Sequence, residues 1–149
     1  ERSLVSFMLR LPVALERVCG SAEVREWFGV RWGQVVDDIA TQWQERGAVD
    51  VPQLLESLAP DMASEITALS MERENLTDTE CARMVDDCLG HLRRRHLKGL
   101  ERDLRLAIRA AEEQQDEKAK RERMLEWQDL VRKERQLERQ KHAQKPSVR

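Results

Sequence analysis

The sequence predicts an all-α protein, in which a compact multi-helix bundle is joined by a long helix to a C-terminal helical hairpin. The composition favours helices, because charged residues make up 36% of the 149 residues, aromatic residues only 4%, and tyrosine is absent. Prolines and glycines divide the first part of the chain into short segments, whereas no proline occurs between Thr77 and Pro146. Short segments of this kind are typical of a bundle, and a long uninterrupted helix needs further packing partners.

The first three helices are predicted by apolar spacing and by residues that begin or end helices. Pro12 ends the first helix and begins the second, Gly20 closes the second, and Ser21 caps the third. The residues expected to face the core are Leu4, Val5, Phe7, Met8, Leu11, Val24, Trp27 and Phe28.

Three further helices are expected before the long one. Gly29 and Gly33 are expected to bracket a turn before the fourth helix, and Gly47 ends that helix. Aspartate caps begin the next two helices, at Asp50 and at Asp61. The apolar residues expected in the core are Val35, Val36, Ile39, Ala40, Trp43, Leu54, Leu55, Leu58, Ile66 and Leu69.

The long helix is expected from Thr77 to about Gln115. Thr77 and Glu80 form a capping-box pattern, in which each side chain accepts from the backbone N–H of the other residue. The apolar residues fall on two successive stripes, namely Cys81, Val85, Cys88 and Leu92, followed by Leu97, Leu100, Leu104, Ile108 and Ala111. At about 3.6 residues per turn, the second stripe lies roughly half a turn from the first, so the helix serves two packing partners.

We therefore expect two subdomains, a helical bundle over residues 1–98 and a helical hairpin over residues 99–149. The stripe changes face just before Gly99, and glycine costs about 1 kcal/mol in a helix interior relative to alanine. Arg95, His96 and Gly99 are accordingly the hinge candidates.

A last helix is expected from the cap Asp116 to about His142, followed by a disordered basic tail from about residue 144. A helix in a two-helix hairpin buries one stripe, but this helix has a broader apolar arc than one partner covers. An aromatic residue flanked by arginines is typical of an interface hot spot. We predict a protein-binding face made of Arg123, Met124, Trp127, Leu130, Val131 and Arg132. The alternative is that Trp127 closes the hairpin.

Charge and cysteine content favour a reduced, cytoplasmic protein. Residues 1–100 have a net charge of −5 and residues 101–149 a net charge of +3, and neither value suggests a nucleic-acid platform. The three cysteines are expected to be reduced thiols. We see neither a signal peptide nor an apolar run long enough for a membrane span. Because the sequence starts at Glu1 without methionine, we expect a fragment of a longer protein.

The sequence shows no catalytic constellation, so no catalytic residue and no metal ligand is assigned. Cys88 and His91 lie three apart on a helix, but two ligands do not make a zinc site. Cys19, Cys81 and Cys88 all fall on apolar stripes, which favours core thiols over nucleophiles. No P-loop, dinucleotide fingerprint or nucleophile elbow appears.

The densest basic cluster consists of Arg93, Arg94, Arg95 and Lys98. So short a cluster neutralises few phosphates, which favours a solvated crossing between the subdomains. Contact with nucleic acid or with an acidic partner is the alternative.

Several short runs in this order resemble the C-terminal helicase-binding domain of bacterial DNA primase. They are Leu69-Ser70-Met71, the Asn75–Asp78 loop, Ile108-Arg109-Ala110-Ala111-Glu112-Glu113, the turn at Gln115-Asp116, and the spaced Leu125, Leu130 and Leu137. The resemblance spans nearly the whole chain. The basic cluster and the four tryptophans do not map onto the family pattern.

The resemblance implies a helical bundle that stimulates the replicative helicase and a hairpin that docks onto the N-terminal domain of that hexameric helicase. The parent primase is a nucleotidyltransferase, but its zinc and its catalytic magnesium are bound outside such a domain. The chain is then a non-catalytic piece that needs no cofactor and has no direct nucleic-acid site. A domain-swapped dimer through the hairpin is possible.

Two alternatives remain. The N-terminal domain of the replicative helicase is built on a fold like the primase bundle, but the Gln115-Asp116 turn followed by a charged last helix argues against it. A helical adaptor unrelated to replication also fits the composition. Continuous heptads would favour an adaptor, but the apolar stripe of the long helix is broken, which argues against it.

Overall fold

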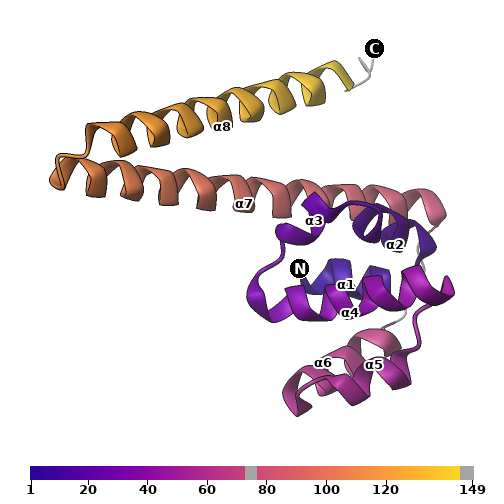
Figure 1. Cartoon of the computed structure of the whole chain (residues 1–149). Coiled ribbons are helices and arrows are strands. Elements are labelled where there is room, and N and C mark those ends of the chain that lie inside the picture. Colours follow the sequence, from indigo (N-terminus) through magenta and orange to yellow (C-terminus); the bar gives the residue numbers. More distant parts are fainter. Residues whose placement is uncertain (73–76, 145–149) are drawn as a thin grey trace. The chain divides into compact units, whose positions relative to one another are not determined.

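The computed structural model describes the backbone of residues 1–72 and 77–144, and it describes side chains through residue 136 and at Arg139. The described residues form helices and no strands, which confirms the predicted all-α class (Figure 1). The helices are α1 (Arg2–Met8), α2 (Pro12–Cys19), α3 (Ala22–Glu26), α4 (Val30–Arg46), α5 (Val51–Ser57), α6 (Pro60–Met71), α7 (Asp78–Glu113) and α8 (Glu117–Gln144). The loop expected at residues 73–76 and the tail expected at residues 145–149 lie outside the described residues.

The chain divides into two compact units, Glu1–Arg94 and Arg95–Arg149. Unit 1 contains α1 to α6 and the first half of α7, whereas unit 2 contains the second half of α7 and α8. The sequence had placed this boundary between residues 98 and 99.

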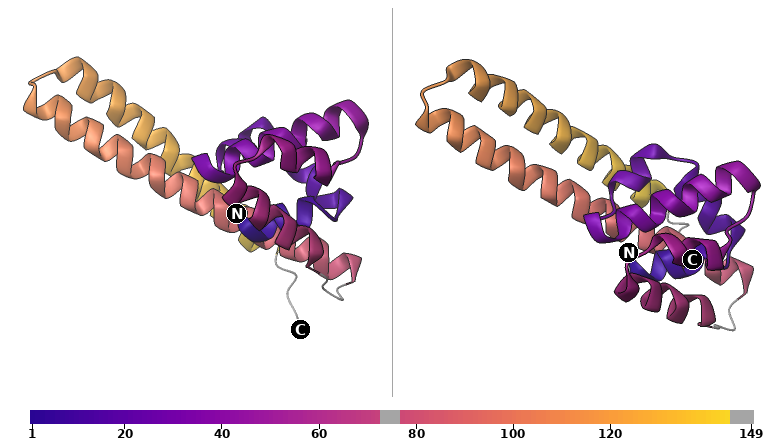
Figure 2. Two further views of the ribbon diagram at one scale, coloured as in Figure 1. Left: turned by 90° about the horizontal axis from the view of Figure 1, so that it is seen from below. Right: turned by 60° about the horizontal axis from the view of Figure 1, so that its bottom comes forward.

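Unit 1 is organised around α1. All five residues from Leu4 to Met8 are buried, so this short helix is covered on every side. It packs against α2 and α6, while α2 also contacts α3 and α4, and α5 contacts α6 (Figure 2). The other large, fully buried side chains of this core are Val18, Val35, Val36, Ile39, Leu54, Ile66, Leu69 and Val85.

Most of the predicted helix ends are confirmed. The Ser21 hydroxyl accepts from the Val24 N–H, and the Asp50 carboxylate accepts from the Gln53 N–H. Gly47 ends α4 in the left-handed conformation with φ of 67°. In the predicted capping box, the Thr77 N–H donates to Glu80 Oε2 at 2.9 Å and the Glu80 N–H donates to Thr77 Oγ1 at 3.3 Å.

Two predictions about helix starts were wrong. Gly29 and Gly33 do not bracket a turn, because α4 begins at Val30 and the Gly33 N–H donates to the Gly29 carbonyl at 2.8 Å as part of the helix. Trp32 is buried and ties this first turn to the core, which outweighs the low helix propensity of glycine. Asp61 does not cap α6, because Pro60 already occupies the first helical position and Asp61 lies in the first turn.

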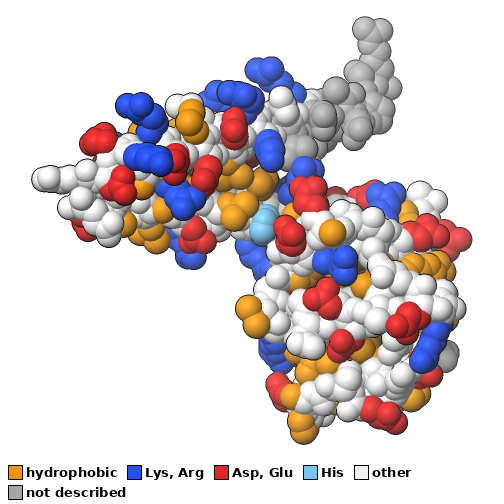
Figure 3. All heavy atoms as spheres, viewed as in Figure 1, with side chains coloured by type: hydrophobic (Ala, Val, Ile, Leu, Met, Phe, Trp, Pro, Cys, Tyr) orange, Lys and Arg blue, Asp and Glu red, His pale blue; other side chains and the backbone are white. Residues whose placement is uncertain are grey.

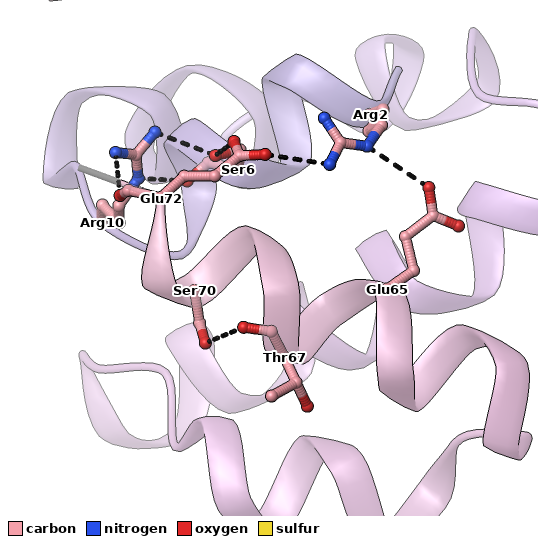
Figure 4. Close-up of polar contacts among 7 residues, drawn as sticks. All are labelled: Arg2, Ser6, Arg10, Glu65, Thr67, Ser70 and Glu72. Carbon is pink, nitrogen blue, oxygen red and sulfur yellow. Dashed lines mark hydrogen bonds and ion pairs between the residues drawn. The ribbon is translucent and has the colours of Figure 1, made fainter. Parts of the chain in front are cut away.

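A polar cluster joins α1 to the end of α6 (Figure 4). Arg2 Nη2 donates to Glu72 Oε1 at 2.9 Å, and the buried Ser6 hydroxyl donates to Glu72 Oε2 at 3.2 Å. Arg10 Nη1 donates to the Glu72 carbonyl oxygen at 2.6 Å. The hydrogen bond from Arg2, together with that from Ser6 and the charges of Arg2 and Arg10, lowers the pKa of Glu72 below its usual value of 4.5.

The hairpin of unit 2 turns through residues 114–116, where α7 ends and α8 returns alongside its second half (Figures 1 and 2). Gln115 adopts a left-handed conformation with φ of 57°. The Asp116 N–H donates to the Ala111 carbonyl at 3.0 Å and the Gln115 N–H to the Glu112 carbonyl at 3.1 Å, which is the Schellman arrangement. Asp116 also caps α8 as predicted, since its Oδ1 accepts from the Ala119 N–H at 2.9 Å. Lys120 Nζ lies 3.0 Å from Glu112 Oε1 and ties the two helices beside the turn.

We expect Glu72→Gln to lower the stability of unit 1 at neutral pH. A carboxyl group whose pKa is depressed by folding stabilises the protein above its unfolded pKa, and this contribution is lost as the pH falls through the folded pKa. The difference between parent and variant should therefore be present at pH 7 and shrink below about pH 4.5. Urea titrations across this range, with the exposed Glu56→Gln as control, measure it. A difference that is constant with pH would contradict the role of the charge.

We expect Gln115→Gly to stabilise unit 2 by about 0.5–1 kcal/mol. Glycine adopts the left-handed conformation without the steric cost that a Cβ imposes, and this gain exceeds its larger loss of chain entropy at such a position. Hydrogen exchange of the hairpin amides measures the effect locally. Gln114→Gly is the matched control, because residue 114 does not have positive φ, and it should not stabilise. Equal effects of the two substitutions would contradict the explanation.

Candidate functional site

The candidate site is a concavity on α8 in unit 2, which we call the Trp127 concavity. It has a volume of about 430 Å³, and its lining residues are Trp127, Gln128, Val131, Arg132, Arg135, Gln136 and Arg139. Trp127 and Val131 are half-buried, whereas the three arginines are exposed. Figure 3 shows apolar side chains along the junction of α7 and α8, with lysine and arginine side chains along α8 interspersed with acidic ones. The site thus has an apolar floor and a basic rim.

The indole N–H of Trp127 has no hydrogen-bond acceptor among the described residues, although its Nε1 is fully buried. A buried donor without an acceptor costs about 1–3 kcal/mol. Trp127 itself is half-buried, so part of the side chain is covered within unit 2 and part of it is accessible. Interfaces favour tryptophan because its ring buries a large apolar area and its N–H can pair with the partner.

The structure brings three of the six predicted binding residues together in the concavity, namely Trp127, Val131 and Arg132. Leu130 is half-buried but does not line the concavity. Arg123 Nη1 donates to both carboxylate oxygens of Glu126 at 2.9 Å. Met124 is 42% exposed and lies outside the lining.

Four lining residues were missed in the sequence, namely Gln128, Arg135, Gln136 and Arg139. The prediction was based on the apolar residues of α8 and the arginines beside them, so it did not include the polar residues further along the helix. Residues 128, 132, 135 and 139 are spaced by four, three and four, which places them along one side of a helix. This polar spacing was the available signal.

The basic cluster is partly used within unit 1. The guanidinium carbon of Arg93 lies 5.5 Å from the centre of the Trp27 ring, a cation–π contact. Arg94 Nη2 lies 3.0 Å from His91 Nδ1. These two arginines therefore pack on or pair with residues of unit 1.

Two of the three thiols have a raised pKa, which disfavours the reactive thiolate form. Burial raises the pKa of the Cys19 thiol to about 11, and burial also raises the pKa of Cys88. Cys81 is buried in the first stripe of α7. His91 is exposed, and over the described residues no group of three or more His, Cys, Asp and Glu side chains is arranged to hold a metal ion.

The three hinge candidates all lie inside α7. Arg95 is exposed, while His96 and Gly99 are half-buried. A Cβ built on Gly99 meets no atom within 4 Å. The glycine is therefore not required by close packing.

Comparisons of the chain with protein-family models, with curated proteins and with solved structures found no match. Within the described part of the chain, no helix combines the length and apolar character that crossing a membrane requires.

We expect Gly99→Ala to slow amide hydrogen exchange over residues 96–102. Alanine fits the open space and is favoured in a helix interior by about 1 kcal/mol. Gly33→Ala is the matched control, because it is also a helical glycine whose Cβ would meet nothing within 4 Å. That variant should leave exchange around residue 99 unchanged. Faster exchange in Gly99→Ala would show that the position needs glycine.

Proposed function

We propose that this chain is a non-catalytic helicase-interaction domain of a bacterial replicative DNA primase. In this role it acts in the bacterial cytoplasm, recruits the primase to the replicative helicase at the fork and stimulates that helicase. The observation that supports the proposal best is the Trp127 concavity, which lies on the hairpin unit. The resemblance in sequence assigns helicase docking to that same hairpin.

The partner in this proposal is the N-terminal domain of the hexameric helicase, and the two units have different tasks. Unit 1 has an extensive buried core and is the candidate for stimulating the helicase. Unit 2 presents the half-buried Trp127 and Val131 beside arginines, and it is the candidate for docking. The catalytic magnesium and the zinc of the parent primase belong to other parts of that protein.

The direct test is calorimetric titration of the chain against a bacterial hexameric replicative helicase, with ATP hydrolysis as a second readout. We expect saturable binding and a faster helicase ATPase, and we expect the chain alone to synthesise no primer. Binding to primase instead of helicase would favour the helicase N-terminal domain. Binding to neither would leave a helical adaptor outside replication as the better assignment.

We expect Trp127→Ala to weaken helicase binding by about tenfold or more, since truncating an aromatic anchor costs about 2 kcal/mol and about 1.4 kcal/mol suffices for tenfold. Unit 1 should stay folded, because its core contains no residue of unit 2. Leu125→Ala is the matched control on α8, because Leu125 is 57% exposed and lies outside the concavity.

Circular dichroism of the same variants separates two roles of Trp127. Weak binding with parental helicity supports an interface residue. Weak binding together with lost helicity means that Trp127 holds the hairpin together. An affinity equal to that of the parent chain would show that Trp127 is not part of the binding site.

A further inference from the structure

We infer that the Trp127 concavity binds an acidic protein surface, in which a carboxylate lies beside an apolar side chain. This inference rests on the proposed function, since it specifies the partner chemistry of the same site. It follows from the residues that line the concavity and from the groups that they leave unpaired.

The first step is the charge of the rim. Arg132, Arg135 and Arg139 line the concavity, and none of the described residues of its lining is a carboxylate. An adjoining hollow lined by Val131, Glu134, Arg135 and Arg139 adds one carboxylate, so the arginines remain in excess. Among the described residues, Arg132 has one ion pair, a distant one with Asp129 at 3.6 Å, in which both side chains are well exposed and which contributes little.

The second step is the hydrogen-bonding character of the site. No carboxylate of the described residues forms an ion pair with Arg135 or Arg139. The Trp127 N–H is a further donor without an acceptor among those residues. Guanidinium and indole groups donate but do not accept, so the matching group on a partner must accept. Because Trp127 Nε1 is covered in the free chain, a neighbouring side chain must move aside before an acceptor can reach it.

The third step selects a carboxylate over a nucleic-acid phosphate. Three arginines on one short stretch of helix neutralise few phosphates, and α8 also carries acidic residues among its basic ones. The floor formed by Trp127 and Val131 offers apolar contact area that a phosphate backbone does not use. A carboxylate accepts bidentately from arginine and can stand next to an apolar side chain on a helix. An acidic, partly apolar protein surface therefore fits all three features.

The test compares two charge reversals on one helix. Arg135→Glu changes the rim, whereas Lys133→Glu makes the same change of charge at an exposed residue outside the concavity. In calorimetric titrations against the helicase, we expect Arg135→Glu to weaken binding by about tenfold or more and Lys133→Glu to have little effect. Helicity of both variants is checked by circular dichroism. Equal affinities of parent and Arg135→Glu would overturn the inference while leaving the proposed function intact.

A second arm does not depend on the helicase. The indole N–H resonance of Trp127 is followed by NMR, assigned with Trp127→Phe, while a helical peptide with one leucine–glutamate stripe is added. We expect a saturable shift that the glutamine version of the peptide does not cause and that Arg135→Glu abolishes. A shift with a single-stranded oligonucleotide instead, or none with the acidic peptide, would overturn the inference. A shift with the acidic peptide but no binding to any helicase would reject only the proposed function.

Discussion

The structure depends on α7, a 36-residue helix that buries side chains in two different units. At about 1.5 Å per residue it is roughly 54 Å long, more than one small core can cover. Its first half buries Cys81, Val85 and Leu92 in unit 1. Its second half has half-buried Leu104 and Ile108 in unit 2. Two apolar stripes on different faces are the consequence, because each unit requires its own buried side.

Unit 1 has one large apolar core that includes the buried residues of α1, and polar contacts fix the ends of its elements. Leu4 and Met8 have no exposed surface, so each loses its full contact with water on folding. Glu72 then gathers donors from two residues of α1, which joins this helix to the end of α6. The role of these polar groups is to specify one arrangement, since the buried Ser6 hydroxyl is satisfied only there.

The sequence was sufficient for features that depend on local chemistry. The capping box at Thr77, the cap at Asp116 and the stop at Gly47 each involve residues within a few positions of one another. The sequence was insufficient for features that depend on contacts between residues far apart in the chain. The helical state of Gly33 depends on the burial of Trp32 in the core, and the cluster at Glu72 joins residues more than sixty positions apart.

The candidate site shows the same limit. The apolar arc identified Trp127 and Val131, because hydrophobic periodicity is visible in one helix. Whether Arg135 and Arg139 face the same hollow depends on how long side chains arrange themselves, and the apolar pattern contains no information on that. That no described residue provides an acceptor for the Trp127 N–H is likewise visible only in the folded chain.

The burial pattern also links the stability of unit 2 to binding. Among the described side chains of unit 2, only Ala111 is buried. Unit 1, in contrast, buries large residues throughout its helices. A two-helix hairpin with half-buried contacts has little apolar burial of its own to offset the entropy of ordering its chain. A partner that covers Trp127 and Val131 adds the missing burial, and any ligand that binds only the folded state stabilises that state. If unit 2 binds its proposed partner through α8, binding by unit 2 and ordering of unit 2 are energetically coupled, whereas the apolar core of unit 1 contains no residue of unit 2.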